Sequence, residues 1–212
     1  MHQRLLDSIL DAGRECGCRL LVSCPRALDL PADASLLPQR GRTFGERLSQ
    51  AFEAASKGSR GPVILVGSDV PGLAVEHLRQ ALRALRRDPS STVVGPSPDG
   101  GLYLLATAAA PDDLLRRIPW CRRETRSALV EELRRSGRNV SLLEPLLDLD
   151  HRSDLERWLS SLAPRTARWR SWAAVLTTLL SRLLKPLLAP APKLPLRRAL
   201  PVSAGRAPPR LP

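Results

Sequence analysis

The sequence predicts an α/β domain with a mostly parallel sheet, because short apolar stretches alternate with helical patterns along most of the chain. The clearest strand is Val63–Val66, four apolar residues bounded by Gly61-Pro62 and Gly67-Ser68. Such a run is typical of a strand buried on both faces, as in a parallel sheet. Asp69 follows at once, and open α/β sheets bind ligands beyond the carboxyl ends of their strands. Asp69 is therefore the first candidate site residue.

The other elements follow from apolar periodicity and from residues that begin or end helices. Thr43 and Glu46 have capping-box spacing, and Gly58 is suited to ending the helix that begins there. Residues 25–42 are proline-rich and predict an irregular connection. The expected helices cover residues 2–15, 43–57, 76–87, 114–117, 124–136 and 153–162, and the expected strands cover residues 19–23, 63–66, 92–95, 102–106 and 139–143.

The positive charge is concentrated at one end of the chain. The formal net charge is +12, yet ten arginines and lysines and no acid lie in residues 163–212, which leaves +2 for residues 1–162. The high isoelectric point therefore describes the C-terminal segment and not a face of the domain. Only seven residues are aromatic, which provides few platforms for stacking bases. We do not expect the domain to bind nucleic acid, and binding by the basic C-terminal segment is kept as a third alternative, after an enzyme and a non-catalytic remnant.

The C-terminal segment divides into two parts. Residues 163–188 predict a basic amphipathic helix, because tryptophans and leucines recur at helical spacing from 166 to 188. Such a helix is typical of contact with an anionic membrane surface, and packing on the domain or on a second subunit is an equal alternative. Residues 189–212 are rich in proline and arginine and predict a disordered extension.

The cysteines indicate a reducing compartment. Cys16, Cys18, Cys24 and Cys121 lack the spacing of a zinc site, so free thiols in the cytosol are expected. No secretory signal is visible, and no apolar run is long enough to span a membrane. We expect a cytoplasmic protein whose membrane contact is limited to the surface helix.

Three loops carry residues suited to chemistry: Ser68-Asp69, Asp99-Gly100-Gly101 and Asp148-Leu149-Asp150. Each loop adjoins a predicted strand, so the sheet could bring all three to one edge. Two carboxylates from separate loops could hold one Mg²⁺ or Mn²⁺ and leave positions open for a diphosphate. The alternatives are an Asp69 that caps the next helix, an Asp99 that only forms a turn, and a solvated loop at 148–150.

Five stretches together resemble a known family: LLPQRGRTFGERLSQAF (36–52), GPVILVGSDVPGL (61–73), GPSPDGGLYLLA (95–106), IPW (118–120) and DLDHRSDLERW (148–158). In this order they resemble the bacterial GT-A-like glycosyltransferases of the DUF2064 type. That family is also described as arsenosugar-biosynthesis glycosyltransferases or as partners of radical-SAM proteins. The resemblance covers roughly residues 1–160.

The resemblance implies a GT-A-like nucleotide-diphospho-sugar transferase fold, a nucleotide-sugar donor, an acceptor it does not identify, and a divalent cation. Asp69 stands at the position of the family's metal carboxylate, and Asp150 would be a second ligand or a nearby acid. The Asp99-Gly100-Gly101 turn would line the sugar or acceptor pocket. Ser68 and Arg47 lie inside matching stretches and are further candidate substrate-binding residues.

The chain also departs from the family pattern. Family members begin with a strand and a basic glycine-containing loop that holds the nucleotide, whereas this sequence starts at what resembles the first helix. We therefore expect an N-terminally incomplete domain, in which two strands next to the missing central one have unpaired edges. A start site placed too late would explain it. The alternatives to glycosyl transfer are nucleotidyl transfer on the same fold and a non-catalytic remnant docked by its basic tail.

Overall fold

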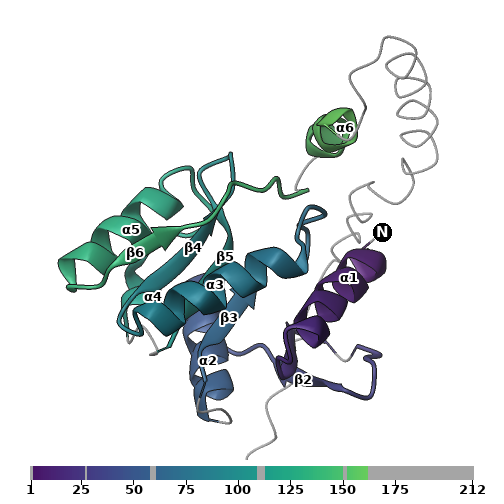
Figure 1. The fold of residues 1–212 in the computed structure, drawn as a ribbon, viewed down its shortest axis with the longest axis horizontal. Helices are drawn as coiled ribbons and strands as arrows, with labels where there is room; N and C mark the ends of the chain where they lie inside the picture. Colours follow the sequence, from purple (N-terminus) through teal and green to yellow (C-terminus); the bar gives the residue numbers. More distant parts are fainter. Residues whose placement is uncertain (1, 27, 58–60, 109–112, 150–151, 162–212) are drawn as a thin grey trace, which may run out of the picture.

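The computed structural model describes residues 2–161 except residues 27, 58–60, 109–112 and 150–151 (Figure 1). Its helices are α1 (His2–Glu15), α2 (Phe44–Lys57), α3 (Val75–Arg87), α4 (Leu114–Arg117), α5 (Thr125–Arg135) and α6 (Arg152–Ser161). Its strands are β1 (Leu20–Cys24), β2 (Ala34–Pro38), β3 (Val63–Val66), β4 (Thr92–Pro96), β5 (Leu102–Thr107) and β6 (Val140–Leu142). The helix and the extension expected after residue 162 lie outside the described residues.

The strands form two separate sheets. The larger has the order β3-β5-β4-β6, and β1 and β2 form a parallel pair of their own. Within the larger sheet β4 and β6 are parallel, while β5 is antiparallel to both β3 and β4. Three of its four strands thus run in one direction and β5 runs against them. The predicted α/β class is confirmed, with β5 as the reversed strand.

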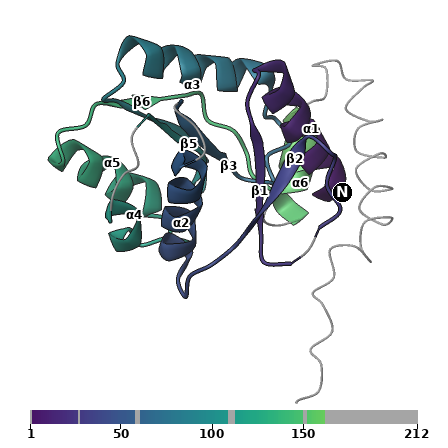
Figure 2. The same cartoon turned by 90° about the horizontal axis from the view of Figure 1, so that it is seen from below.

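Helices cover both faces of the larger sheet, as Figure 2 shows. α3 lies on one face, and α2, α4 and α5 lie on the other. Successive strand residues point to opposite faces, so Val93 belongs to the core under α3 and Val94 to the core under α2, α4 and α5. The sheet is therefore the middle of three layers, and its strand ends remain available to form a site.

The start of α2 follows the predicted capping box. The Glu46 N–H donates to Thr43 Oγ1 at 3.2 Å, and the Glu46 carboxylate accepts the N–H groups of Thr43 and Arg42. These backbone donors hold the pKa of Glu46 below its ordinary value. The box fixes the direction in which α2 leaves the loop.

Two strands differ from the sequence predictions. β2 lies inside residues 25–42, which we expected to be irregular, and it pairs residue by residue with β1. Its stretch ends in proline and has no clean alternation, so only the tertiary contact with β1 identifies it. β3 is half-buried along its whole length instead of buried on both faces. The reason is its place at the edge of the larger sheet.

No helix among the described residues is long and apolar enough to cross a membrane. All four cysteines are free thiols.

Gly95 in β4 is predicted to be intolerant of a side chain. A Cβ there would lie 2.5–2.7 Å from ring atoms of Tyr103, which is 2% exposed and cannot move aside. We expect Gly95→Ala to lower the free energy of unfolding by about 1–3 kcal/mol, as overpacking a filled core does. Urea denaturation of the full chain measures this.

Gly72→Ala is the matched control, because Gly72 is exposed and its added Cβ would meet Leu146 at an ordinary 3.4 Å. Equal urea midpoints for the two variants would contradict the packing of Tyr103 against β4.

Candidate functional site

A cavity of about 470 Å³ lies where the two sheets face each other. β1 lines it on one side and β3 on the other, although the two strands belong to separate sheets. Its walls are mostly apolar and include side chains of α1, α2 and β5. The residues in its lining that could contact a polar ligand include Ser23, Gln39, Arg47, Ser68, Asp69, Tyr103 and Trp120.

Gln39 donates a hydrogen bond to a backbone carbonyl on the side of β1 that faces away from β2. Its backbone N–H donates to the Cys24 carbonyl at 3.1 Å, which continues the β1–β2 ladder. Carbonyls alternate in direction along a strand, so the carbonyl of Ser23 points away from β2. The Gln39 side-chain amide donates to this carbonyl at 3.2 Å. Gln39 thus supplies a donor that a neighbouring strand would otherwise provide.

Asp69 sits in the turn that follows β3. The Gly67 N–H donates to the Tyr103 carbonyl at 2.9 Å and extends the pairing of β3 with β5. A Cβ on Gly67 would lie 2.8 Å from Asp69 Oδ1, so glycine lets the carboxylate fold back over the turn. Asp69 is half-buried and lines the cavity, while Ser68 beside it is exposed.

Residues 143–149, here named the crossing segment, run across the ends of the strands to Asp69. Three backbone N–H groups attach the segment at intervals of three residues. Leu143 donates to the carbonyl of Val94 at 2.9 Å, Leu146 to that of Pro96 at 3.1 Å, and Leu149 to that of Asp69 at 2.9 Å. The loop that carries Asp148 is therefore joined to the Asp69 turn. Asp150 lies outside the described residues.

Tyr103 of β5 attaches the crossing segment to the larger sheet. Its hydroxyl donates to the Glu144 carbonyl at 3.1 Å, and its ring packs edge-on against His77 of α3. Burial, with a smaller contribution from the charge of Glu144, raises the pKa of Tyr103 to about 12. Tyr103 was not among the predicted site residues. Its sequence context does indicate a role, because Tyr103 places a hydroxyl group inside an apolar strand. A buried hydroxyl needs a hydrogen-bond partner.

The turn at Asp99 lies at the same end of the sheet but does not line the cavity. Asp99 is exposed, and its Oδ1 accepts the Gly101 N–H at 2.8 Å. Gly100 has a φ of +99° and packs against the Arg123 carbonyl, and its own carbonyl accepts the Arg126 N–H at 3.0 Å. The turn is thus fixed to the start of α5, which agrees with the turn-forming role considered for Asp99.

Arg47 reaches the cavity from α2. It is half-buried, and its guanidinium carbon lies 5.8 Å from the centre of the Phe44 ring, a cation–π contact.

Ser97 was also not among the predicted site residues. It is fully buried between β4 and the Asp99 turn. Its Oγ has no hydrogen-bond partner among the described residues.

Asp69 is the carboxylate that this end of the sheet presents to the cavity. Among the described residues, no group of three or more His, Cys, Asp or Glu side chains is placed to hold a metal ion. Mg²⁺ is commonly bound by one or two carboxylates together with substrate phosphates. Asp69, half-buried at the cavity and joined through its backbone carbonyl to Leu149 beside Asp148, provides one such carboxylate.

Comparison with known proteins agrees with the resemblance in the motifs. Residues 19–122 match the family model DUF2064, described as "Uncharacterized protein conserved in bacteria". A protein from Desulfovibrio desulfuricans G20, provisionally described as a nucleotide-diphospho-sugar transferase, superposes with a TM-score of 0.68 at 24% identity, covering 87% of this chain and 84% of its own. The 2-C-methyl-D-erythritol 4-phosphate cytidylyltransferase from Thermus thermophilus gives 0.49 at 22% identity, covering 84% and 88%. No curated protein matches the chain.

The chain's one tyrosine gives a direct test of the crossing segment's anchor. The folded pKa of Tyr103, about 12, lies above the ordinary value of 10.0. The hydroxyl therefore keeps its proton to a higher pH in the folded state than in the unfolded state. This difference in pKa stabilises the fold fully below pH 10, and the stabilisation is lost as the pH rises toward 12. We expect phenolate absorbance to titrate about two pH units higher in the folded chain than in urea.

Tyr103→Phe isolates the hydroxyl. We expect it to cost about 0.5–1.5 kcal/mol at neutral pH and to speed amide exchange in residues 143–149. It should also remove the loss of stability that the titration of this hydroxyl causes between pH 10 and 12. An ordinary phenol titration in the folded chain would contradict the buried contact with Glu144.

Proposed function

We propose that this chain, whose residues 19–122 match DUF2064, is a divalent-cation-dependent glycosyltransferase with a nucleotide-diphospho-sugar donor. The observation that carries the proposal is the hydrogen bond from the Leu149 N–H to the Asp69 carbonyl. It joins the Asp69 turn, which lines a cavity of about 470 Å³, to the loop that carries Asp148. The fold shared with the Desulfovibrio protein supports a sugar-nucleotide substrate class.

Each candidate residue has a proposed role at this edge. Asp69 and Asp150 would hold Mg²⁺ or Mn²⁺ through carboxylate oxygens. When bound, the cation supplies a positive charge opposite the one that develops on the leaving diphosphate. Arg47, which lines the same cavity, would contact the diphosphate from α2, and the exposed Ser68 hydroxyl would donate to it.

Asp99 is proposed to contact the sugar or the acceptor. Its Oδ1 is used by Gly101, but its Oδ2 has no hydrogen-bond partner among the described residues and is exposed. Because Gly100 and Gly101 carry no side chains, a ligand can approach the backbone of this turn closely. The turn's attachment to α5 keeps Asp99 in place without a ligand.

The two alternative functions give different products. Glycosyl transfer releases a nucleoside diphosphate from the sugar nucleotide, whereas nucleotidyl transfer to a sugar phosphate releases pyrophosphate from a nucleoside triphosphate. A non-catalytic remnant releases neither. Incubating the chain with each substrate set and Mn²⁺ therefore separates them by product.

Asp69→Asn tests the cation site. We expect binding of UDP-, GDP- or dTDP-glucose, measured by equilibrium dialysis, to require Mn²⁺ or Mg²⁺ for the accepted nucleotide. The variant should weaken that binding at least about tenfold, since even outer-shell partners of a metal cost that much.

Asp113→Asn is the matched control, because Asp113 is an exposed carboxylate at the start of α4 and does not line the cavity. Its affinity should equal that of the parent chain. Cation-dependent binding that survives Asp69→Asn would sink the metal assignment, and binding of no sugar nucleotide by the parent would sink the donor class.

A further inference from the structure

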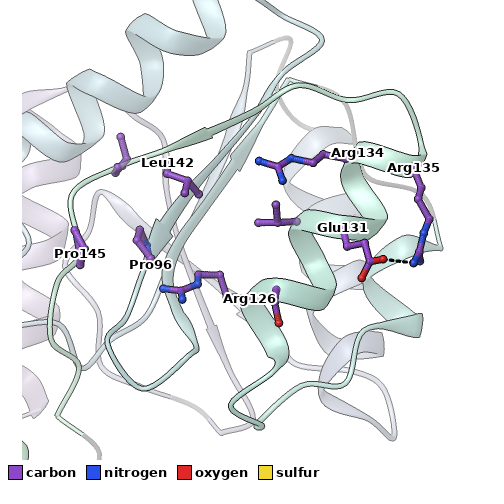
Figure 3. A pocket seen from close by; sticks show the side chains of 10 residues that line it. Pro96, Arg126, Glu131, Arg134, Arg135, Leu142 and Pro145 are labelled. Atoms are coloured by element: carbon purple, nitrogen blue, oxygen red, sulfur yellow. Dashed lines mark hydrogen bonds and ion pairs between the residues drawn. The ribbon is translucent and has the colours of Figure 1, made fainter.

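A second, shallower groove of about 820 Å³ lies between α5 and β6 (Figure 3). Its apolar surface includes Val130 of α5 and Leu142 of β6, and Leu142 is 57% exposed. Pro96 and Pro145 line its other side. When a peptide adds a strand to an open sheet edge, main-chain hydrogen bonds give affinity and pockets for alternate side chains give specificity, and this apolar surface beside β6 can serve as such a pocket.

β6 offers an unpaired strand edge to this groove. It is the last strand of the larger sheet, and within the part of the chain that the structure describes it pairs only with β4. The carbonyl of Asn139 and the N–H of Leu143 bond to β4, at 2.7 and 2.9 Å. Backbone groups alternate in direction along a strand, so those of Val140 and Leu142 point to the open side. No described residue bonds to them there, which leaves a template for an added strand.

Two arginines give the groove a positive charge. Arg126 and Arg134 both project from α5 toward the groove in Figure 3, and neither has an ion-pair partner among the described residues. Arg135, by contrast, is paired with Glu131. Arg126 is moreover half-buried, so its charge is only partly screened by water.

We propose that this groove binds an extended acidic segment of another protein, which adds to β6 as a further strand. Arg126 and Arg134 are eight residues apart on α5, or about 12 Å along the helix axis. Residues four apart on a strand face the same side about 13 Å apart. The separation of the two arginines therefore favours a five-residue pattern in the bound strand. Its first and fifth residues are acidic, its third is apolar, and its second and fourth are unrestricted.

The apolar residue of that pattern would cover Leu142 and Val130 between the two arginines. Residues 163–212 of this chain contain ten basic residues and no acid, so charge excludes them as the occupant. The inference does not depend on the proposed glycosyl transfer, because it uses neither Asp69 nor the cavity.

The test measures binding of a fluorescently labelled synthetic peptide, Thr-Glu-Thr-Leu-Thr-Glu-Thr, to the full chain. Fluorescence anisotropy of the peptide reports the binding. We expect saturable binding that weakens with salt and is lost when both glutamates become lysine. Arg126→Gln and Arg134→Gln should each weaken binding roughly two- to fivefold, as exposed charge pairs do. Arg87→Gln, an exposed arginine on α3, is the matched control and should have no effect.

Two further arms separate strand addition from general attraction. In a chain with both Arg126→Glu and Arg134→Glu, the lysine peptide should bind and the glutamate peptide should not. The glutamate peptide should also slow amide exchange of Val140 and Leu142. No binding, binding insensitive to both arginine variants, or unchanged exchange at these two amides would each overturn the proposal.

Discussion

The hydrogen bond between the Leu149 N–H and the Asp69 carbonyl is the constraint on which the candidate site depends. Without it the loop at residues 148–150 and the turn after β3 would be independent loops. The bond forms because the crossing segment is fixed earlier to β4 and to the Tyr103 hydroxyl. The backbone that carries Asp69 and Asp148 is thus positioned by the sheet and its core, and preorganisation of this kind would favour the proposed cation site.

The division of the strands into two sheets has both a structural and a functional consequence. β3 has the apolar composition of a central strand, yet all four of its residues are half-buried because it lies at an edge. The cavity occupies the space between β3 and β1, and the Gln39 amide satisfies one carbonyl on the side of β1 away from β2. Asp69, the candidate cation ligand, lines this cavity directly after β3.

Local patterns predicted most of the fold, and long-range contacts account for what they missed. The capping box at Thr43 and Glu46 and the apolar run of β3 are signals within a few residues, so the sequence suffices to find them. β2 is identified only by its pairing with β1. The contact of Tyr103 with Glu144 spans 41 residues of sequence, and no spacing rule could have indicated it. The Asp69 turn, the Asp99 turn and residues 148–149 lie at the same end of the larger sheet, and of their described residues only those of the Asp69 turn line the cavity.

The central claim is that a divalent cation binds where the crossing segment meets Asp69. Paramagnetic broadening by Mn²⁺ in the presence of UDP, followed on backbone amides of the full chain, measures this most directly. The account predicts that the amide signals of Ser68, Asp69 and Leu149 broaden first and together, while that of Val130 on α5 is unaffected at the same Mn²⁺ concentration. Broadening centred on any other part of the chain, or spread evenly over it, would contradict the account.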